Sequence, residues 1–214
     1  MGELIYLNER RAEHLRAAAT AKPAFFFDLA CPLSYLTAER IERTLGDVEW
    51  VPVARATLRP EAGADNVRAL CDRAEAYADA LHLPLVWPES FPAAAPRALR
   101  AAAHACDVAA GARFVLAASR LAFCGGFDLE DPETLAEAAA AAGVPLDDCL
   151  DAATCSDRDA DLRATADGLR ARGVTDLPAI RVGRNWFSGE AGLTAACAMM
   201  QQSGVYDQSQ APVG

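Results

Sequence analysis

The sequence predicts a mixed α/β protein in which an all-helical segment interrupts a small sheet. Residues 24–54 read as strand, helix and strand in close succession. Residues 64–172 are rich in alanine and follow helical periodicity, and strand patterns return at residues 179–187. A chain of 214 residues is long enough for one domain that carries a sizeable insertion.

The first three elements form a βαβ unit. Residues 24–27 are an apolar run, as expected of a strand buried on both faces. Pro32 suits the first turn of a helix, and Gly46 ends it. Residues 48–53 provide a second strand at short range. The two strands should therefore be parallel, with a right-handed crossover between them.

The helical segment has recognisable boundaries inside it. Asp131-Pro132-Glu133 is a helix start signal, and Gly143 and Gly173 are stop signals. Residues 179–182, a turn and Trp186-Phe187 then predict a hairpin. A last helix is expected over residues 189–201.

This order, βαβ then helical insertion then ββα, is that of a thioredoxin fold interrupted after its second strand. We expect the thioredoxin-like domain to comprise residues 23–63 and 173–203, with the helical insertion at 64–172. Residues 1–22 are interpreted as an N-terminal extension, and residues 204–214 as a flexible tail.

Composition excludes several classes of function. The chain is 52% hydrophobic, but no apolar run approaches the roughly eighteen residues of a membrane span. Its net charge of −10, without a Lys/Arg cluster, argues against a nucleic-acid partner. The first residues lack the basic and apolar regions of a signal peptide, so we expect a cytoplasmic protein.

The chain has seven cysteines, an odd number scattered mostly through apolar helical stretches, which argues against a disulfide framework. Most are interpreted as reduced, buried small residues. The three histidines are isolated, so we expect no metal site.

Cys31 is the candidate catalytic residue. It directly follows a buried strand and precedes Pro32, so its sulfur should lie over unpaired N–H groups at a helix N-terminus, which favours the thiolate. Such a position lowers a thiol pKa by about one unit. Asp28 opposes this shift. Ser34, one helical turn further along, is placed to donate to the sulfur but cannot resolve a mixed disulfide. The alternative is an inert core cysteine.

Pro178 is the second candidate, because it directly precedes the third strand. A cis peptide bond fits this position, although a trans proline starting a strand is the alternative. In a thioredoxin fold such a proline faces the helix that carries the thiol. The backbone of Leu177 would then pair with an extended thiol ligand.

Two further residues have a structural and a functional interpretation. Cys124, followed by two glycines, is either a distal resolving thiol or the end of a helix. Trp87 either helps to wall an apolar substrate pocket near Cys31 or belongs to the core.

The sequence resembles the DsbA-like thioredoxin proteins, especially the branch of 2-hydroxychromene-2-carboxylate isomerase and kappa-class glutathione transferase. The most specific segment is Phe25 to Leu36, which is similar to a strand ending in Asp-x-x-Ser-Pro-x-Ser-Tyr-Leu. Segments 83–92 and 127–133, the Leu177-Pro178 pair and residues 186–190 also resemble that branch.

Three departures limit what the resemblance implies. The isomerase branch has Ser where this chain has Cys31, and the redox-active members have a second Cys where it has Ser34. Glutathione-using relatives carry a Gln-Asp-Arg-like run where this chain has Ser188-Gly189-Glu190. Ser188 and Gly189 are a candidate site for a carboxylate of a thiol cofactor at the helix N-terminus, or Ser188 is simply an N-cap.

These observations support three hypotheses. The first is a monothiol oxidoreductase in which Cys31 forms mixed disulfides with a small thiol or disulfide substrate and an external thiol completes the cycle. The second is a thiol-dependent isomerase or transferase that uses glutathione or another low-molecular-weight thiol. The third is a non-catalytic thioredoxin-like binding protein. No tightly bound cofactor and no membrane partner are expected, and relatives of this kind suggest a homodimer.

Overall fold

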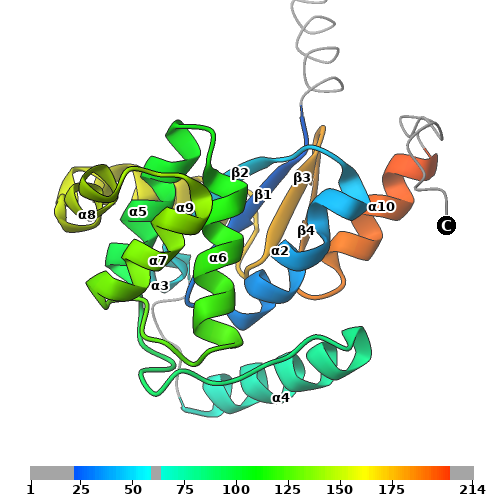
Figure 1. The fold of residues 1–214 in the computed structure, drawn as a ribbon. Helices are drawn as coiled ribbons and strands as arrows, with labels where there is room; N and C mark the ends of the chain where they lie inside the picture. The colour runs from blue at the N-terminus through cyan, green and yellow to red at the C-terminus, as the bar shows by residue number, and fades with distance from the viewer. Residues whose placement is uncertain (1–21, 59–63, 203–214) are drawn as a thin grey trace, which may run out of the picture.

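A four-stranded mixed sheet forms the centre of the protein. The structure, a computed structural model, describes residues 22–58 and 64–202. The strands are β1 (Ala24–Phe27), β2 (Glu49–Pro52), β3 (Ala179–Val182) and β4 (Asn185–Ser188), in the order β2-β1-β3-β4 (Figure 1). Strands β1 and β2 are parallel, and the other neighbours are antiparallel. The predicted βαβ unit and C-terminal hairpin are both confirmed.

Strand β1 is central because its aromatic run packs on both faces of the sheet. Every residue from Ala24 to Phe27 is buried. Phe25 meets Trp50 of β2 edge to face at 5.0 Å between ring centroids, and Phe26 packs against Trp186 of β4 at 5.2 Å. Such contacts add to the burial of the rings themselves. The end of β1, where the chain leaves the sheet, is thereby held in a fixed place.

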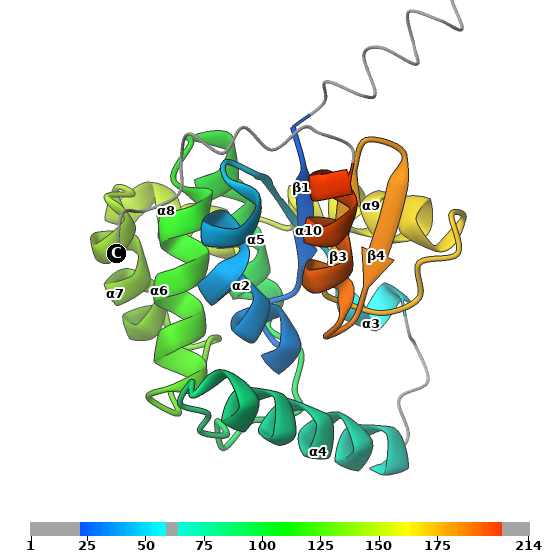
Figure 2. The ribbon, with the colours of Figure 1, turned by 90° about the vertical axis from the view of Figure 1, so that its right-hand side faces the viewer.

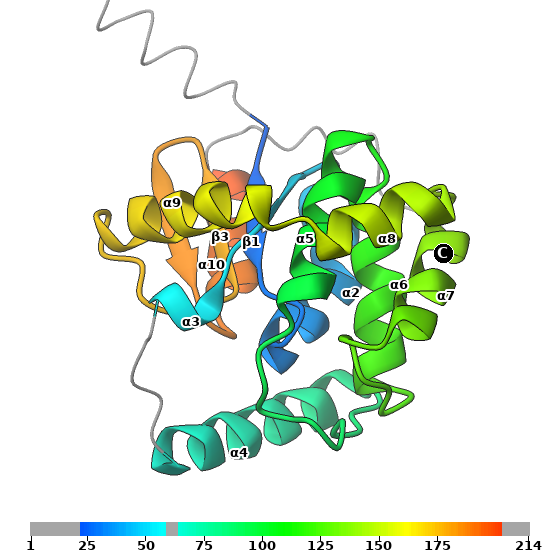
Figure 3. The same cartoon turned by 90° about the vertical axis from the view of Figure 1, so that its left-hand side faces the viewer.

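Helices cover both faces of the sheet. Helices α2 (Pro32–Leu45) and α10 (Gly192–Gln202) lie on one face (Figure 2), and α9 (Asp159–Arg170) crosses the other, beside α3 (Arg55–Leu58) and α5 (Pro96–Asp107) (Figure 3). As predicted, α2 begins at Pro32 and is closed by Gly46.

The remaining helices lie to one side of the sheet, except for α4, which crosses one end of it. They are α4 (Ala64–Leu81), α6 (Gly111–Phe123), α7 (Pro132–Ala142), α8 (Leu146–Thr154) and a 3-10 turn, Ser156–Arg158. Alanine makes up much of their packed faces, for example Ala118 and Ala122 of α6 and Ala138 and Ala139 of α7. Small side chains bring helix backbones close together, so this part of the core is dense with few large residues.

Helix α4 lies apart from the other helices. It crosses the end of the molecule from which α2 starts (Figure 2). Leu70, Ala74 and Ala78 are buried along its inner side. Arg40 of α2 donates to the Tyr77 hydroxyl at 2.9 Å, which ties α4 to the helix beneath it. Helix α4 therefore covers the end of the sheet where β1 runs into α2.

Some expectations concern parts of the chain outside the described residues. The N-terminal extension, apart from Lys22, and the tail at 204–214 lie there. The peptide bond between Phe91 and Pro92 is cis, which the sequence analysis did not predict. Among the helices within residues 22–58 and 64–202, none combines the length and hydropathy needed to cross a membrane.

The N-terminus of α7 provides a test of the local folding signals. Asp131 is the N-cap and accepts a hydrogen bond from the Glu133 N–H at 3.0 Å. Replacing Asp131 with Ala should lower the free energy of unfolding by about 1 kcal/mol, since that N–H loses its partner. Urea unfolding measures the change. Asp131→Asn, which keeps a capping oxygen, is the control, and equal losses in both variants would contradict the capping role.

Candidate active site

Cys31 occupies a rigid turn between β1 and α2. It is the N-cap residue of α2, with extended backbone angles. Its N–H donates to the Asp28 carbonyl at 3.1 Å, and its own carbonyl accepts from the N–H groups of Ser34 at 3.0 Å and Tyr35 at 3.2 Å. The turn is therefore closed by three backbone hydrogen bonds, and Pro32 at the first helical position fixes the exit direction.

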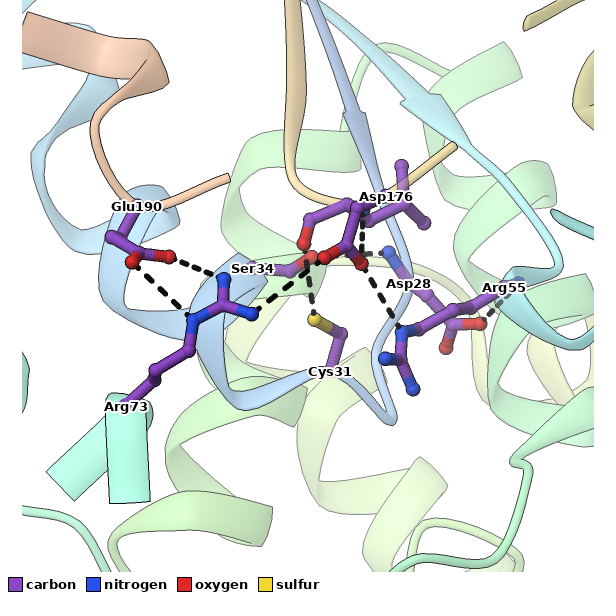
Figure 4. Close-up of polar contacts among 8 residues, drawn as sticks. Asp28, Cys31, Ser34, Arg55, Arg73, Asp176 and Glu190 are labelled. Carbon is purple, nitrogen blue, oxygen red and sulfur yellow. Dashed lines mark hydrogen bonds and ion pairs between the residues drawn. The ribbon is translucent and has the colours of Figure 1, made fainter. Parts of the chain in front are cut away.

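The thiol of Cys31 meets the segment that contains Pro178. The Leu177–Pro178 bond is cis, as the sequence suggested. Cys31 Sγ donates to the Leu177 carbonyl oxygen at 3.7 Å, across 146 positions of sequence (Figure 4). The Leu177 N–H donates a hydrogen bond to the carboxylate of the preceding residue, Asp176, at 3.0 Å. The structure thus brings together Cys31, Leu177 and Pro178, which the sequence analysis had linked.

The Cys31 side chain is more enclosed than predicted. It has 0% exposed surface, and burial raises the pKa of its thiol. Arg55 and the Ser34 hydroxyl act in the opposite direction but are smaller effects than burial. The expectation of a lowered pKa is wrong for this closed structure, because a helix N-terminus does not compensate for complete loss of water around a thiolate. Burial therefore favours the protonated thiol of Cys31 in this structure.

Asp28 links the turn at Cys31 to the end of β2. Its carboxylate accepts the Ala30 N–H at 2.8 Å and the Arg55 N–H at 2.7 Å. Burial raises the pKa of Asp28, and these two hydrogen bonds oppose the shift without cancelling it. The charge of Asp28 also raises the pKa of Cys31, but as the smallest of the contributing effects. Asp28 thus acts mainly as a positioning residue for the two loops.

Two arginines near Cys31 were missed by the sequence analysis. Asp176 lies between them, with Arg55 Nε at 3.8 Å from Oδ1 and Arg73 Nη1 at 3.9 Å from Oδ2 (Figure 4). Arg55 is the first residue of α3, three positions after the end of β2, and parallel strands β1 and β2 end at the same edge of the sheet, so its position was predictable. Arg73 comes from α4, and no local pattern indicates that this helix reaches the site.

Arg73 also joins α4 to the turn that precedes α10. Its guanidinium forms a two-pronged ion pair with the Glu190 carboxylate (Figure 4). This pairing raises the pKa of Arg73 and lowers that of Glu190. Both side chains are about 40% exposed, so the pair orients the segments more than it stabilises the fold.

Comparisons with known proteins agree with this arrangement. The family model of the DSBA-like thioredoxin domain matches residues 24–196. The chain belongs to this family. No curated protein matches the sequence.

Three solved structures share the DsbA-like fold. A 2-hydroxychromene-2-carboxylate isomerase is 15% identical, with a TM-score of 0.71 over 86% of this chain and 99% of that chain. A Nitrosomonas europaea protein described as a protein disulfide isomerase is 15% identical, with a TM-score of 0.64 over 86% and 99%. A Streptomyces coelicolor protein described as a DsbA oxidoreductase is 20% identical, with a TM-score of 0.63 over 90% and 92%. At these identities the likeness shows the fold alone.

In this DsbA-like chain, Ser188 and Gly189 differ from expectation. Ser188 is exposed and is the last residue of β4, paired with Ala179. Gly189 has φ +73° and donates its N–H to the Pro178 carbonyl at 2.9 Å. The last helix starts at Gly192, three residues later than predicted. Ser188 is therefore not the N-cap of the last helix, and the role of Ser188 and Gly189 in binding a thiol cofactor stays a prediction.

Cys124 lies beside Tyr35. Tyr35 belongs to α2 and stands one helical turn after Cys31. The Tyr35 hydroxyl donates to the Pro84 carbonyl at 2.9 Å and lies 3.2 Å from Cys124 Sγ. Either atom can be the donor in this second contact. Burial and the Cys124 contact raise the pKa of Tyr35. Cys124 ends α6 as one interpretation proposed, and its resolving role stays a prediction.

Trp87 contacts α4 and its own loop. Its indole Nε1 donates to Glu75 at 2.9 Å, and its ring packs against Phe91 at 4.7 Å between centroids. Its role as a wall of a substrate pocket stays a prediction. Within the described parts of the chain, no group of three or more His, Cys, Asp or Glu side chains is arranged to hold a metal ion.

The enclosed thiol predicts the pH dependence of Cys31 alkylation. Because burial raises its pKa, the thiolate that reacts with iodoacetamide should form only at a higher pH than in a free thiol. Peptide mass spectrometry over a pH series measures this, with glutathione alkylated in parallel as the free thiol. Exposed Cys155 shows in the same spectra that the reagent is active. A half-maximal rate of Cys31 at a lower pH than glutathione would contradict the expectation.

Proposed function

We propose that this protein is a thiol oxidoreductase of the DsbA-like family that works with Cys31 alone. The observation that carries the proposal is the contact between Cys31 Sγ and the carbonyl of Leu177, the residue before cis-Pro178. The thiol faces a backbone edge suited to an extended ligand. What sets this contact apart is that its carbonyl belongs to the residue before a cis-proline.

The proposed reaction has two steps of thiol-disulfide exchange. The Cys31 thiolate attacks one sulfur of a low-molecular-weight disulfide, forms a mixed disulfide and releases the other sulfur as a thiolate. A second, external thiolate then attacks the mixed disulfide, restores the Cys31 thiolate and leaves as a new disulfide. The external thiol is required because Ser34, not a cysteine, stands one helical turn after Cys31.

The burial of Cys31 requires the covering segments to move before reaction. Helix α4 crosses this end of the molecule, and Arg73 holds it to Glu190 and Asp176. In this proposal, separation of α4 from the turn at Glu190 admits the disulfide. Access then raises the thiolate fraction as well, since water returns to the sulfur.

Weakening this attachment should speed the reaction of Cys31. In Arg73→Ala, alkylation of Cys31 at fixed pH is expected to be about two- to fivefold faster, because a partly exposed ion pair is worth up to about 1 kcal/mol. Time-resolved peptide mass spectrometry measures the rate. Arg68→Ala, an exposed arginine of the same helix, is the matched control. An unchanged alkylation rate in Arg73→Ala would mean that the attachment of α4 does not control access to the Cys31 thiol.

The test of the proposed function is the position of the glutathione adduct. The full-length protein is incubated with glutathione disulfide, and the modified peptides are mapped by mass spectrometry without reduction. We expect an adduct on Cys31 that reduced glutathione removes, both in the wild-type chain and in Cys155→Ala, which lacks the exposed cysteine. Adducts confined to the other cysteines would overturn the proposal.

A second candidate is an isomerase or transferase that positions a thiol cofactor. The TM-score of 0.71 with 2-hydroxychromene-2-carboxylate isomerase and the hydroxyl of Ser34 beside Cys31 favour it. In this case Cys31 orients a cofactor thiol and forms no mixed disulfide. A third candidate, a non-catalytic binding protein, is favoured by the complete burial of Cys31. The adduct experiment separates the first candidate from both.

A further inference from the structure

A pocket lies next to the active-site turn, on the opposite side of the sheet from α2. Helices α3, α5 and α9 surround it, and all three lie on the face shown in Figure 3. Its volume is about 270 Å³. The walls are mostly apolar and comprise Ala54, Ala94, Ala95, Pro96, Leu99 and Leu162.

The size of the pocket limits its occupant. A cavity of about 150 Å³ with apolar walls holds a benzene molecule. A pocket of about 270 Å³ therefore has room for one ring and its substituents. Apolar walls of this kind bind the body of a ligand, and a few polar groups fix its orientation.

Asp28 is the buried polar residue of this pocket, with a relative exposure of 7%. Each of its carboxylate oxygens accepts one backbone N–H, from Ala30 and from Arg55. A carboxylate oxygen accepts more than one hydrogen bond, so acceptor capacity remains on both. The pocket thus presents hydrogen-bond acceptors to a ligand with an O–H or N–H group.

Two charged residues, Asp159 and Arg163, lie at the rim of the pocket. Asp159 is bound by the guanidinium of Arg100 through two hydrogen bonds of 2.7 and 2.8 Å. Arg163 is exposed and donates through Nε to the Asp159 carbonyl at 2.8 Å. In the interior, the carboxyl group of Asp28 disfavours a ligand carboxylate placed against it.

We infer that this pocket binds a small apolar molecule, about one ring in size, whose hydroxyl or neutral amino group donates a hydrogen bond to Asp28. The site is distinct from the Cys31 thiol but adjoins it, because the Asp28 carbonyl accepts the Cys31 N–H. The inference goes beyond thiol exchange and does not depend on it.

Three probes that each contain one benzene ring test the ligand chemistry on the full-length protein. They are p-cresol, toluene and benzoate, with affinities measured by ligand-observed NMR titration. We expect p-cresol to bind about tenfold more tightly than toluene, since a hydrogen bond to a carboxylate favours it, and benzoate to bind most weakly. Equal affinities of p-cresol and toluene, or tightest binding of benzoate, would overturn the inference.

Variants locate the binding site. Ala56→Leu, at an exposed position of α3 on the pocket, and Leu162→Trp should each weaken p-cresol binding at least tenfold, because both fill the space. Ala80→Leu makes the same change at an exposed position of α4 and should leave the affinity unchanged. Thermal unfolding shows that each variant is folded. Unchanged p-cresol binding in Ala56→Leu and Leu162→Trp would place the ligand elsewhere and reject the pocket.

The outcome is separable from that of the proposed function. Loss of p-cresol binding with a normal glutathione adduct on Cys31 rejects the pocket alone. Normal p-cresol binding with no adduct on Cys31 supports the pocket and rejects the thiol exchange.

Discussion

Replacing Cys31 with alanine is expected to abolish the proposed reversible exchange with glutathione at the turn between β1 and α2. The other cysteines include buried Cys149 and exposed Cys155, and neither adjoins the cis-proline segment in the way that Cys31 does. Loss of the attacking sulfur removes the reaction itself, so the rate should fall to the background of these cysteines. Stopped assays with glutathione disulfide, read by mass spectrometry, measure the change.

Serine at the same position discriminates between the candidate functions. Cys31→Ser keeps a small hydrogen-bond donor toward the Leu177 carbonyl but has no sulfur that forms a disulfide. For an oxidoreductase, Cys31→Ser and Cys31→Ala should be equally inactive. For an enzyme that positions a cofactor thiol, Cys31→Ser should retain turnover that Cys31→Ala lacks. Full exchange activity in Cys31→Ala would show that Cys31 takes no part in the reaction.

Unfolding of the Cys31→Ala variant does not account for the expected loss of exchange activity. Deleting one buried sulfur without collapse of the site destabilises a protein modestly compared with loss of a large side chain such as Phe25. Far-ultraviolet circular dichroism and urea unfolding of Cys31→Ala therefore serve as checks. The N-cap position contributes no side-chain hydrogen bond to α2, which limits the structural effect further.

The turn at Cys31 was predictable because its signals are local. An apolar run followed by Cys-Pro predicts a strand that passes directly into a helix, and the structure has both. Pro178 was placed opposite the thiol through the order of the elements, and the contact from Cys31 to Leu177 confirms this. These inferences need only chain order and short-range patterns.

The environment of Cys31 was not predictable in the same way. Its burial depends on where α4 packs, and α4 is an amphipathic helix whose sequence does not specify a partner. Arg73 reaches the site only through that packing, and Glu190 only because the last helix starts after a turn. The sign of the pKa shift of Cys31 was wrong because it depends on water exclusion by distant segments.

Asp28 is expected to have the largest effect on stability among the residues of the site. In Asp28→Ala, the partly buried N–H groups of Ala30 and Arg55 lose their acceptor. A fully buried unpaired N–H costs about 1–3 kcal/mol, so these two partly buried groups should together cost roughly 1–3 kcal/mol at neutral pH, reduced by the removal of a buried charge. Urea unfolding measures it, and Asp28→Asn, which keeps one acceptor oxygen, should lie between alanine and wild type.

The pH dependence of the stability difference between wild type and Asp28→Ala identifies the cause of that difference. Burial raises the pKa of Asp28 in the folded protein above its ordinary value of 3.8, so the folded state holds the proton more tightly than the unfolded chain. The stability that the carboxyl contributes is thus complete below pH 3.8 and decreases as the pH rises through the folded-state pKa. The gap in unfolding free energy between wild type and Asp28→Ala should therefore narrow as the pH increases. A gap that widens with pH would mean that the ionised carboxylate is the favoured form, and that its backbone hydrogen bonds outweigh its burial.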